Sequence, residues 1–318
     1  MNRSVMRFAQ LTLAAAALAG CSDDLPEAWE VTTLRVFAIR QESTPTAGEP
    51  LALTALWTEP RAGRSSRVAW FTPCWNPAGN SFAACFEDLR AADPAAATIS
   101  EESRVEITVP EDVLIEQSDG TYVGTGFVFF VACNGTLLPT ASQRASDVPF
   151  DCVDESGSPL GSDDYVFSFA TVTVEEDAAN VVPSLVEVQL EGRSIPLDCI
   201  GDDCVDDASP IEPIECGEGE PRCVDVCDDP KTCTGAPLAV SVDPESLELL
   251  DSGEPETSWV RAYATGRELD KELDVVTTEE PSAEFELKAE QDATMRFWVT
   301  LHDARGGASW ASFRLRAR

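Results

Sequence analysis

The amino-acid sequence predicts an all-β protein made of two antiparallel β-sandwich domains. Three observations support this prediction. Apolar side chains alternate with polar ones in short segments, β-branched and aromatic residues fill those segments, and Gly, Pro, Asp or Asn separate them. Helical patterns occur at 86–92 and 110–117, and both are brief. The 318 residues leave room for two domains of ordinary size.

The first domain is expected to span residues 31–182. Apolar and polar residues alternate at 51–57 and again at 104–109, which indicates strands with one buried face. Residues 127–131 are apolar at every position, which predicts a strand buried on both faces. The alternation returns at 165–174.

The second domain is expected to span residues 183–318. Its strand signals lie at 186–191, 238–242, 259–264, 284–288, 295–301 and 309–315. The last two flank 303–307, where glycine supplies the positive φ of a hairpin turn. The segment 197–236 interrupts the pattern with six cysteines and twelve Asp or Glu. We expect a disulfide-rich acidic insertion there, because the segment has too few apolar residues to bury a core of its own.

The first twenty residues have the layout of an export signal. Two arginines precede a short apolar run, and two small residues precede Cys21. The run is shorter than the roughly 20 apolar residues that cross a bilayer. Leu18–Cys21 resembles the lipobox of bacterial lipoproteins, which implies removal of residues 1–20 and lipid attachment at Cys21. The alternative is an ordinary cleaved signal peptide with a chance cysteine at its end.

Residues 21–30 are polar and are expected to form a short tether. Ser22 follows Cys21, and this favours delivery to the outer membrane, because aspartate at that place retains lipoproteins at the inner membrane under the better-known sorting rule. The predicted location is therefore the cell envelope, with the chain held on the outer membrane through lipidated Cys21.

The formal net charge is −35, with three lysines and a single histidine. This charge excludes nucleic acid as a predicted partner, because proteins bind phosphates with clustered Lys and Arg. Adhesion to anionic lipid head groups by charge is disfavoured for the same reason. The acidity favours solubility, and cations or basic partners.

The chain has eleven cysteines, and subtracting Cys21 leaves an even ten. Disulfides persist in oxidising compartments, so this count is a second indication of export. Many pairings are possible. Pairing between neighbours predicts Cys74–Cys85, Cys133–Cys152, Cys199–Cys204, and bonds among Cys216, Cys223, Cys227 and Cys233.

Stretches at both ends of the chain resemble bacterial immunoglobulin-like modules. Leu34–Arg40 and Ala47–Leu56 resemble an opening strand, a turn and a second strand. Ala262–Gly266 and Phe297–Gly307 are similar to surface-lipoprotein repeats of the immunoglobulin-like or PKD-like kind, which close on an Asp-x-Arg-Gly-Gly turn. The resemblance implies two immunoglobulin-like sandwiches in an envelope protein, and it implies no activity, because such modules share no chemistry. The cysteine-rich insertion is not part of the usual module.

The acidic insertion is the candidate metal site. Its clustered carboxylates could suit Ca²⁺, but the glycine and terminal glutamate of an EF-hand loop are missing. A solvated acidic loop is therefore the favoured interpretation. Zinc is disfavoured because oxidised cysteines offer no thiolates. We predict no metal and no cofactor. The aspartates concerned are Asp202, Asp203, Asp206 and Asp207 around Cys204, and Asp225, Asp228 and Asp229 around Cys227.

Two further groups of residues could carry function. His302 lies beside Asp303, but a hydrolase triad would also need a nucleophile, so chance adjacency in a hairpin is favoured. Four tryptophans could stack on sugars if they were exposed, but on alternating strands they are more often core. They are Trp57, Trp70, Trp75 and Trp298.

The predicted function is that of a non-enzymatic, membrane-anchored cell-envelope lipoprotein that presents β-sandwich domains for binding or scaffolding. A protein or glycan of the envelope is the expected partner. The alternatives are a carbohydrate- or peptidoglycan-binding module and a calcium-stabilised adhesin.

Overall fold

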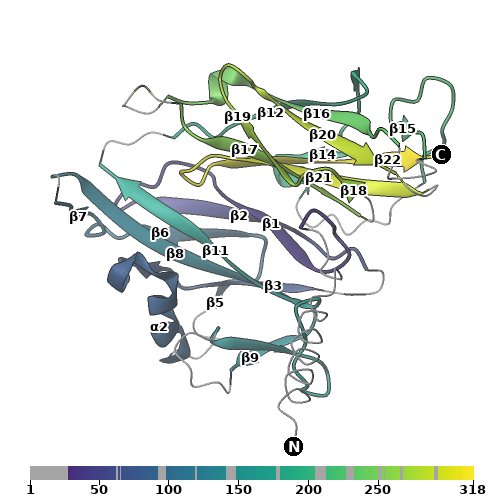
Figure 1. Ribbon diagram of the computed structural model, residues 1–318. Helices are drawn as coiled ribbons and strands as arrows, with labels where there is room; N and C mark the ends of the chain where they lie inside the picture. Colours follow the sequence, from purple (N-terminus) through teal and green to yellow (C-terminus); the bar gives the residue numbers. More distant parts are fainter. Residues whose placement is uncertain are drawn as a thin grey trace, which may run out of the picture.

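A computed structural model describes residues 28–61, 64, 66–91, 98–118, 120–140, 148–176, 180–204, 213–226, 233–249, 253, 255–265, 268–289 and 293–318. This part of the chain is an all-β fold of antiparallel sheets (Figure 1). No helix within it is both long and apolar enough to cross a membrane. The expected signal peptide, Cys21 and most of the expected tether lie outside the described residues.

The first sandwich is built from two sheets. One has the order β1-β2-β6, and the other has the order β11-β8-β3-β5, with two short strands added to β8. The strands are β1 (Arg35–Gln41), β2 (Pro50–Thr58), β3 (Arg67–Phe71), β4 (Cys74–Trp75), β5 (Thr98–Ser100), β6 (Arg104–Thr108), β7 (Ile115–Glu116), β8 (Tyr122–Cys133) and β11 (Tyr165–Glu175).

The core of the first sandwich follows from the alternation in the sequence. Leu51 and Leu53 of β2 and Ile107 of β6 face Trp70 of β3 and Phe130 of β8. The other face of β8 is also buried, as the unbroken apolar run predicts.

The second sandwich has sheets of the orders β13-β12-β16-β20-β18 and β14-β22-β21-β17-β19. Its core includes Leu238, Phe285, Phe297 and Phe313. The strands are β12 (Leu185–Leu190), β13 (Arg193–Ser194), β14 (Cys199–Ile200), β15 (Cys223–Val224), β16 (Ala236–Val242), β17 (Ser258–Ala264), β18 (Glu268–Leu269), β19 (Leu273–Val276), β20 (Ser282–Lys288), β21 (Thr294–His302) and β22 (Ala308–Ala317).

Both sandwiches have the immunoglobulin-like strand order. In each, the first, second and fifth main strands form one sheet (β1, β2 and β6; β12, β16 and β20), and the third, sixth and seventh form the other (β3, β8 and β11; β17, β21 and β22). This confirms the predicted fold class of two antiparallel immunoglobulin-like sandwiches. The four sheets lie in a stack, in which the β17-β21-β22 sheet faces β1 and β2 (Figure 1).

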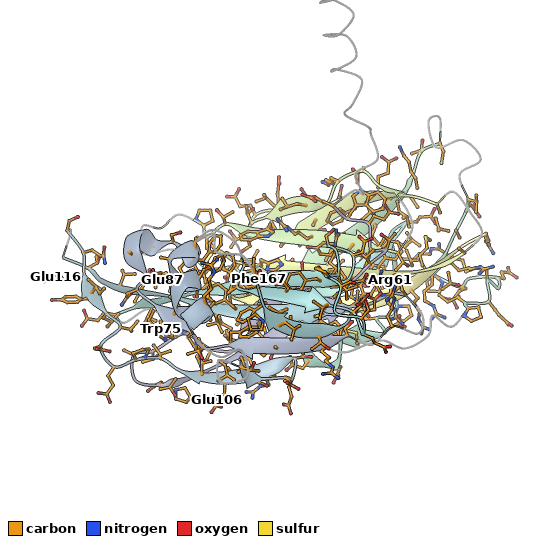
Figure 2. All side chains as sticks on the ribbon, turned by 90° about the horizontal axis from the view of Figure 1, so that it is seen from below. Arg61, Trp75, Glu87, Glu106, Glu116 and Phe167 are labelled. Atoms are coloured by element: carbon orange, nitrogen blue, oxygen red, sulfur yellow. A yellow bond between two sulfur atoms is a disulfide. The ribbon has the colours of Figure 1, made fainter. Side chains whose placement is uncertain are left out.

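The second buried face of β8 is covered by local structure. A β-hairpin and short helices pack there, around Phe71, Phe127 and Phe129. Figure 2 looks toward this side, with Glu87 of the helix to one side of Phe167 and Arg61 to the other. The covering elements are β9 (Thr136–Pro139), β10 (Phe150–Val153), η1 (Ala78–Asn80), η2 (Phe82–Cys85) and α2 (Phe86–Ala91).

The helical pattern at 86–92 is confirmed by α2, but the one at 110–117 is wrong. Residues Ile115–Glu116 form β7 and pair with β8. The Asn76 Nδ2 group donates to the Val113 backbone oxygen at 2.7 Å, and Val113 is buried in the first core. Tertiary contacts therefore hold this segment extended against its local propensity. The remaining short helices are η3 (Gly201–Cys204) and η4 (Pro244–Ser246).

Two expectations about the second sandwich need correction. The insertion does bury apolar groups: Ile214 and Val224 are buried, and β14 and β15 pair with β22. The last residues of the expected tether are also part of the fold. Trp29 is buried in the second core, and the Val31 N–H donates to the Ala264 oxygen at 2.8 Å. A single aromatic side chain in a polar stretch was enough to dock it.

Candidate functional site

The two sandwiches meet through a small aromatic core. Phe37 and Leu56, on the outward face of β1 and β2, pack against Tyr263, Trp298 and Trp310, on the outward face of the β17-β21-β22 sheet. The ring centroid of Phe37 lies 4.7 Å from that of Tyr263 and 5.0 Å from that of Trp298. A β-bulge between Val36 and Ala38 breaks the alternation of β1 at this point. The interface is therefore packed like the interior of a domain.

The turn closed by the Cys199–Cys204 disulfide extends this interface. Cys204 is buried in the aromatic core, and the Asp202 carboxylate lies 2.5 Å from the Arg40 guanidinium of β1. The Arg40 guanidinium also lies over the Trp310 ring, at 4.8 Å from its centroid. The Trp310 Nε1 group donates to the Gly201 oxygen. A charged and a stacking contact thus join the insertion to the first sandwich.

The Asp-x-Arg-Gly-Gly turn forms the third contact. The Gln41 N–H donates to the Gly306 oxygen at 3.2 Å. Gly306 has φ +94°, and a Cβ atom added there would lie 1.8 Å from the Gln41 Nε2 atom. Glycine is required at this position both for the backbone conformation and for the close approach of β1.

Asp303 and Arg305 hold the turn in place. The Asp303 carboxylate accepts from the backbone N–H of Arg305 at 2.8 Å and of Gly307 at 2.7 Å, and from Asn180 Nδ2 at 3.1 Å. Burial raises the pKa of Asp303, and the charge of Glu256 raises it further, against the lowering effect of these hydrogen bonds. Arg305 pairs with Glu256 through two hydrogen bonds, of 3.0 and 2.8 Å.

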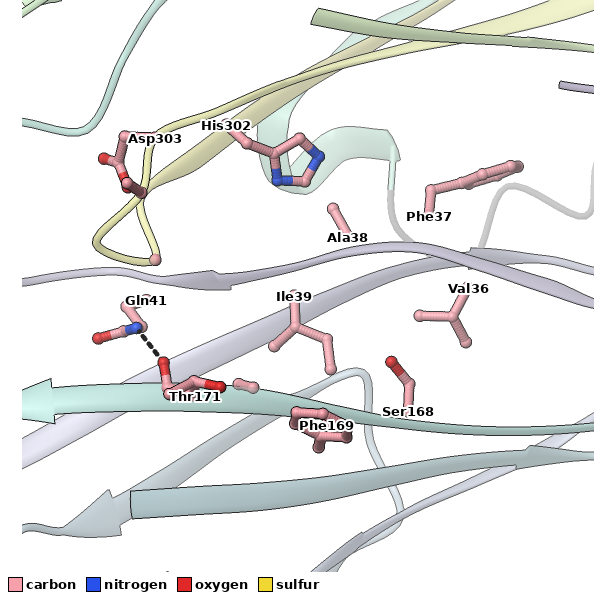
Figure 3. A pocket seen from close by; sticks show the side chains of 13 residues that line it. Val36, Phe37, Ala38, Ile39, Gln41, Ser168, Phe169, Thr171, His302 and Asp303 are labelled. Carbon is pink, nitrogen blue, oxygen red and sulfur yellow. Dashed lines mark hydrogen bonds between the residues drawn. The ribbon is translucent and has the colours of Figure 1, made fainter. Parts of the chain in front are cut away.

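A cavity of about 310 Å³ opens beside this turn (Figure 3). Its walls come from β1, from β11 and from the turn after β21. Apolar side chains dominate the β1 and β11 walls, and polar groups gather at one end. The lining residues used below are Val36, Ile39, Gln41, Phe169 and His302.

His302 lines the cavity without forming a catalytic triad. Its Nε2 atom lies 2.9 Å from Thr300 Oγ1, but Thr300 is fully buried, so this hydroxyl cannot reach a substrate. The imidazole stacks on Trp259, with 5.6 Å between the ring centroids. Burial lowers the pKa of His302 to about 4, and the charge of Arg261 adds to this effect. The ring is therefore neutral at pH 7, and the Asp303 carboxylate is engaged within the turn.

The four candidate tryptophans have two kinds of environment. Trp70 and Trp298 are fully buried, the first inside a sandwich and the second between the sandwiches. Trp57 and Trp75 are half-buried and pack against the first core. The Trp75 ring also presses on Gly126, where an added Cβ atom would lie 2.3 Å from it. The core interpretation therefore describes their packing.

The acidic insertion does not gather its carboxylates. Asp202 pairs with Arg40, and Asp225 lies 3.6 Å from Arg318. Among the described residues, no three His, Cys, Asp or Glu side chains converge on a point that could hold a metal. Calcium binding stays a prediction, because four of the aspartates lie outside the described residues: Asp206, Asp207, Asp228 and Asp229.

The disulfides join the cysteines that neighbour pairing predicts. The structure contains Cys74–Cys85, Cys133–Cys152, Cys199–Cys204 and Cys216–Cys223. Cys233 is also disulfide-bonded, and Cys227 lies outside the described residues.

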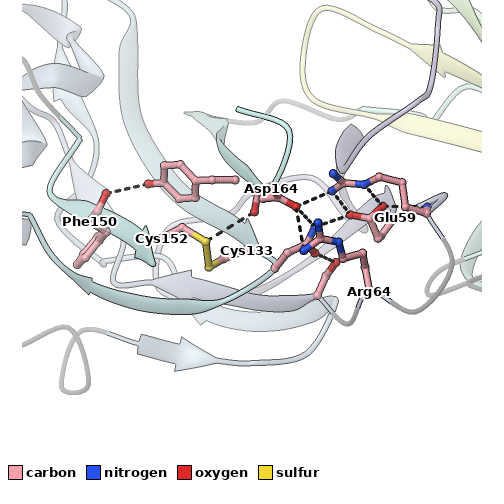
Figure 4. The surroundings of a disulfide bond; sticks show 10 residues. Glu59, Arg64, Cys133, Phe150, Cys152 and Asp164 are labelled. Atoms are coloured by element: carbon pink, nitrogen blue, oxygen red, sulfur yellow. Dashed lines mark hydrogen bonds and ion pairs between the residues drawn. A yellow bond between two sulfur atoms is a disulfide. The ribbon is translucent and has the colours of Figure 1, made fainter. Parts of the chain in front are cut away.

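An ion-pair network lies beside the Cys133–Cys152 bond (Figure 4). The Arg61 guanidinium bridges Glu59 and Asp164, at 2.6 and 2.7 Å. Hydrogen bonds from Arg61 and from Asn134 lower the pKa of Glu59 against the opposing effect of burial. Every charge in this network is paired, so the network positions the loop before β11 and offers no free group for chemistry.

Phe37, Arg40 and Gln41 of β1 were not singled out by the sequence, although they make the contacts between the sandwiches. The one signal that pointed to this place was the Asp-x-Arg-Gly-Gly turn, because a glycine pair can mark close approach of another backbone.

Sequence comparison finds no matching protein family and no similar curated protein. Among solved structures, the D00-D0 domain of intimin is similar over 90% of this chain and 99% of its own, with 9% identity and a TM-score of 0.24. The D0-D1 domain of intimin covers 89% of this chain and 96% of its own, with 11% identity and a TM-score of 0.21. Dimeric latent PorU from Porphyromonas gingivalis covers 90% of this chain with 24% of its own length, at 11% identity and a TM-score of 0.22. At these TM-scores, the immunoglobulin-like assignment rests on the strand order itself.

Proposed function

We propose that this chain is a non-enzymatic lipoprotein of the cell envelope, anchored through Cys21, that presents two immunoglobulin-like sandwiches as one rigid unit for binding or scaffolding. The observation that carries this proposal is the aromatic core between the sandwiches. Two domains joined by an apolar, fully packed interface hold a fixed relative orientation, whereas domains with a polar interface move by default. A fixed pair of sandwiches suits display of a binding surface.

The anchor is supported by two features of different kinds. The sequence Leu18–Cys21 matches the lipobox pattern, and the remaining ten cysteines suit an oxidising compartment. Four disulfides between described residues fit this compartment. Delivery to the outer membrane is the destination that Ser22 favours.

The anchor is tested by expressing the chain in a bacterium with the substitution Cys21→Ser. We expect the unaltered chain in the membrane fraction with a lipid mass on its first mature residue, and the variant in the soluble fraction. An unmodified Cys21 in the mature, membrane-associated protein would contradict the proposed anchor.

The non-enzymatic role is supported by the buried hydroxyl of Thr300 and by the engaged carboxylate of Asp303. It is tested by incubating the oxidised protein with ester, peptide and glycoside substrates. We expect no turnover above that of a heat-unfolded sample. Turnover that is lost in the variant His302→Gln would contradict this part of the proposal.

A further inference from the structure

Most edge strands of this fold are protected against pairing with another chain. β5, β13, β14, β15 and β18 have only two or three residues each, and β6 carries Arg104 and Glu106. β1 has a bulge and two arginines. These are the devices by which natural sheets blunt their edges.

β11 is an edge strand without such protection. It has 11 residues, and its register with β8 runs unbroken from Tyr165 opposite Cys133 to Glu175 opposite Val123. It contains no proline, no bulge and no charge before Glu175. A long, flat, apolar edge is a template for an added strand.

The neighbouring hydrogen bonds show which backbone groups of β11 point outward. The Asp164 oxygen accepts from the Asn134 N–H on the β8 side, whereas the Thr171 oxygen accepts from the Gln41 side chain on the other side. Successive residues of a strand alternate in this direction. The N–H and C=O groups of Phe167 and Phe169 therefore point to the free edge. No hydrogen bond from a described residue reaches them there.

Side-chain space lies on both faces of this free edge. On one face is the 310 Å³ cavity, which Val36 and Ile39 line from β1 (Figure 3). On the other face, the Phe169 ring stacks on the exposed Phe82 ring, with 4.6 Å between the centroids. Alternate side chains of an added strand would meet one or the other.

We propose that the free edge of β11 binds an extended, positively charged segment of a partner protein by β-strand addition. This inference rests on the proposed binding function and names the class of partner. Backbone groups of Phe167 and Phe169 supply the affinity, and the cavity selects an apolar side chain, as in other strand-addition complexes.

Charge selects a basic partner. Exposed carboxylates stand at both ends of the strand: Asp163 before it, and Glu175 and Glu176 at its end. The whole chain has a net charge of −35, so a second copy would bring like charges to the same edge.

The test titrates the full, oxidised protein with a synthetic peptide of alternating Val and Thr that has lysines at both ends. A matched peptide has glutamates in their place. We expect the lysine peptide to bind about tenfold more tightly, and to slow hydrogen exchange at the Phe167 and Phe169 amides. Equal binding of the two peptides, or no binding, would overturn the proposal.

Two sets of variants sharpen this test. Phe169→Pro removes an outward N–H that the sheet does not use, which edge strands tolerate, and should weaken binding about tenfold, whereas Phe169→Leu should bind as the natural chain does. The double variant Glu175→Lys with Glu176→Lys should favour the glutamate peptide instead, and it decides the matter if the proline variant does not fold.

A second copy of the chain as occupant is a distinct outcome. Protection of the Phe167 and Phe169 amides that grows with protein concentration, in the absence of peptide, would overturn the basic-partner proposal. The membrane fractionation of Cys21 and the substrate assays do not depend on this edge. If they give the expected results while the peptides fail to bind, only the present inference falls.

Discussion

The two sandwiches solve the same packing problem in different ways. Each has a sheet whose central strand, β8 or β21, is buried on both faces. In the first sandwich the extra face is covered by α2, the β9-β10 hairpin and their disulfides. In the second it is covered by the first sandwich itself, through Phe37 and Leu56. Local, cross-linked structure does in one domain what a neighbouring domain does in the other.

This difference separates what each region depends on. The outer face of the first sandwich depends on covalent bonds within its own segment. The outer face of the second depends on apolar contacts between segments far apart in the sequence. Removing the contacts between the sandwiches should therefore harm the second more, and removing disulfides should harm the first more.

The largest effect is expected for Trp298→Ala. Trp298 is 2% exposed, and its ring lies in the core between the sandwiches. We expect the free energy of unfolding to fall by about 3–5 kcal/mol, because the substitution leaves a cavity where both sandwiches meet. Urea denaturation measures this. The control is Val186→Ala at a 60% exposed position, with an expected change within about 0.5 kcal/mol. Equal effects of the two substitutions would contradict a packed interface.

Removing the Cys133–Cys152 disulfide, by changing both cysteines to Ala, should lower the free energy of unfolding by about 2–5 kcal/mol. The matched change at Cys216 and Cys223 should cost about 1 kcal/mol less, since that bond closes 7 residues instead of 19. Chemical denaturation of both variants gives the comparison. A greater loss from the bond in the insertion would show that the covering of the first sandwich does not depend on its own cross-links.

Gly306→Ala tests the turn that joins the sandwiches. The positive φ and the overlap with Gln41 both oppose a Cβ atom, so we expect a loss of about 1–3 kcal/mol in the free energy of unfolding. Gly253→Ala is the control, because Gly253 also has a positive φ but has no atom within 4 Å of an added Cβ. If the two variants lost the same stability, backbone strain alone would explain the effect, and the contact with Gln41 would contribute nothing.

The pH dependence tests the burial of His302. Its pKa is about 4 in the folded chain against 6.5 for the free group, so the unfolded chain binds a proton that the folded chain refuses between these values. Stability should fall by about 1–2 kcal/mol as the pH drops from 6.5 to 4.

The variant His302→Gln should lack this part of the pH dependence. The raised pKa of Asp303 acts with the opposite sign, and it cancels when the two curves are subtracted. Thermal unfolding at a series of pH values measures the difference. A curve for the variant that is parallel to that of the natural chain would contradict the burial of a neutral ring.

Much of the fold could be predicted because it depends on local patterns. The alternation at 51–57 and the apolar run at 127–131 gave β2 and β8, and the glycine turn at 303–307 gave the final hairpin. Close cysteines gave the bonds that the structure contains.

The interface could not be predicted, because alternation tells which face of a strand is buried and not what covers it. Phe37 on β1 and Trp298 on β21 are far apart in the sequence, and each could equally have faced its own core. The segment 110–117 failed for a similar reason. Its extended shape depends on the hydrogen bond from Asn76 to the Val113 oxygen, which no local pattern announces.

Scanning calorimetry of the oxidised protein tests most directly whether the sandwiches form one unit. A packed aromatic interface predicts a single unfolding transition whose calorimetric and van't Hoff enthalpies agree. Introducing a charge by Phe37→Asp should then split this transition in two. Two separate transitions in the natural chain would show that the sandwiches unfold independently, and would contradict the rigid unit on which the proposed function depends.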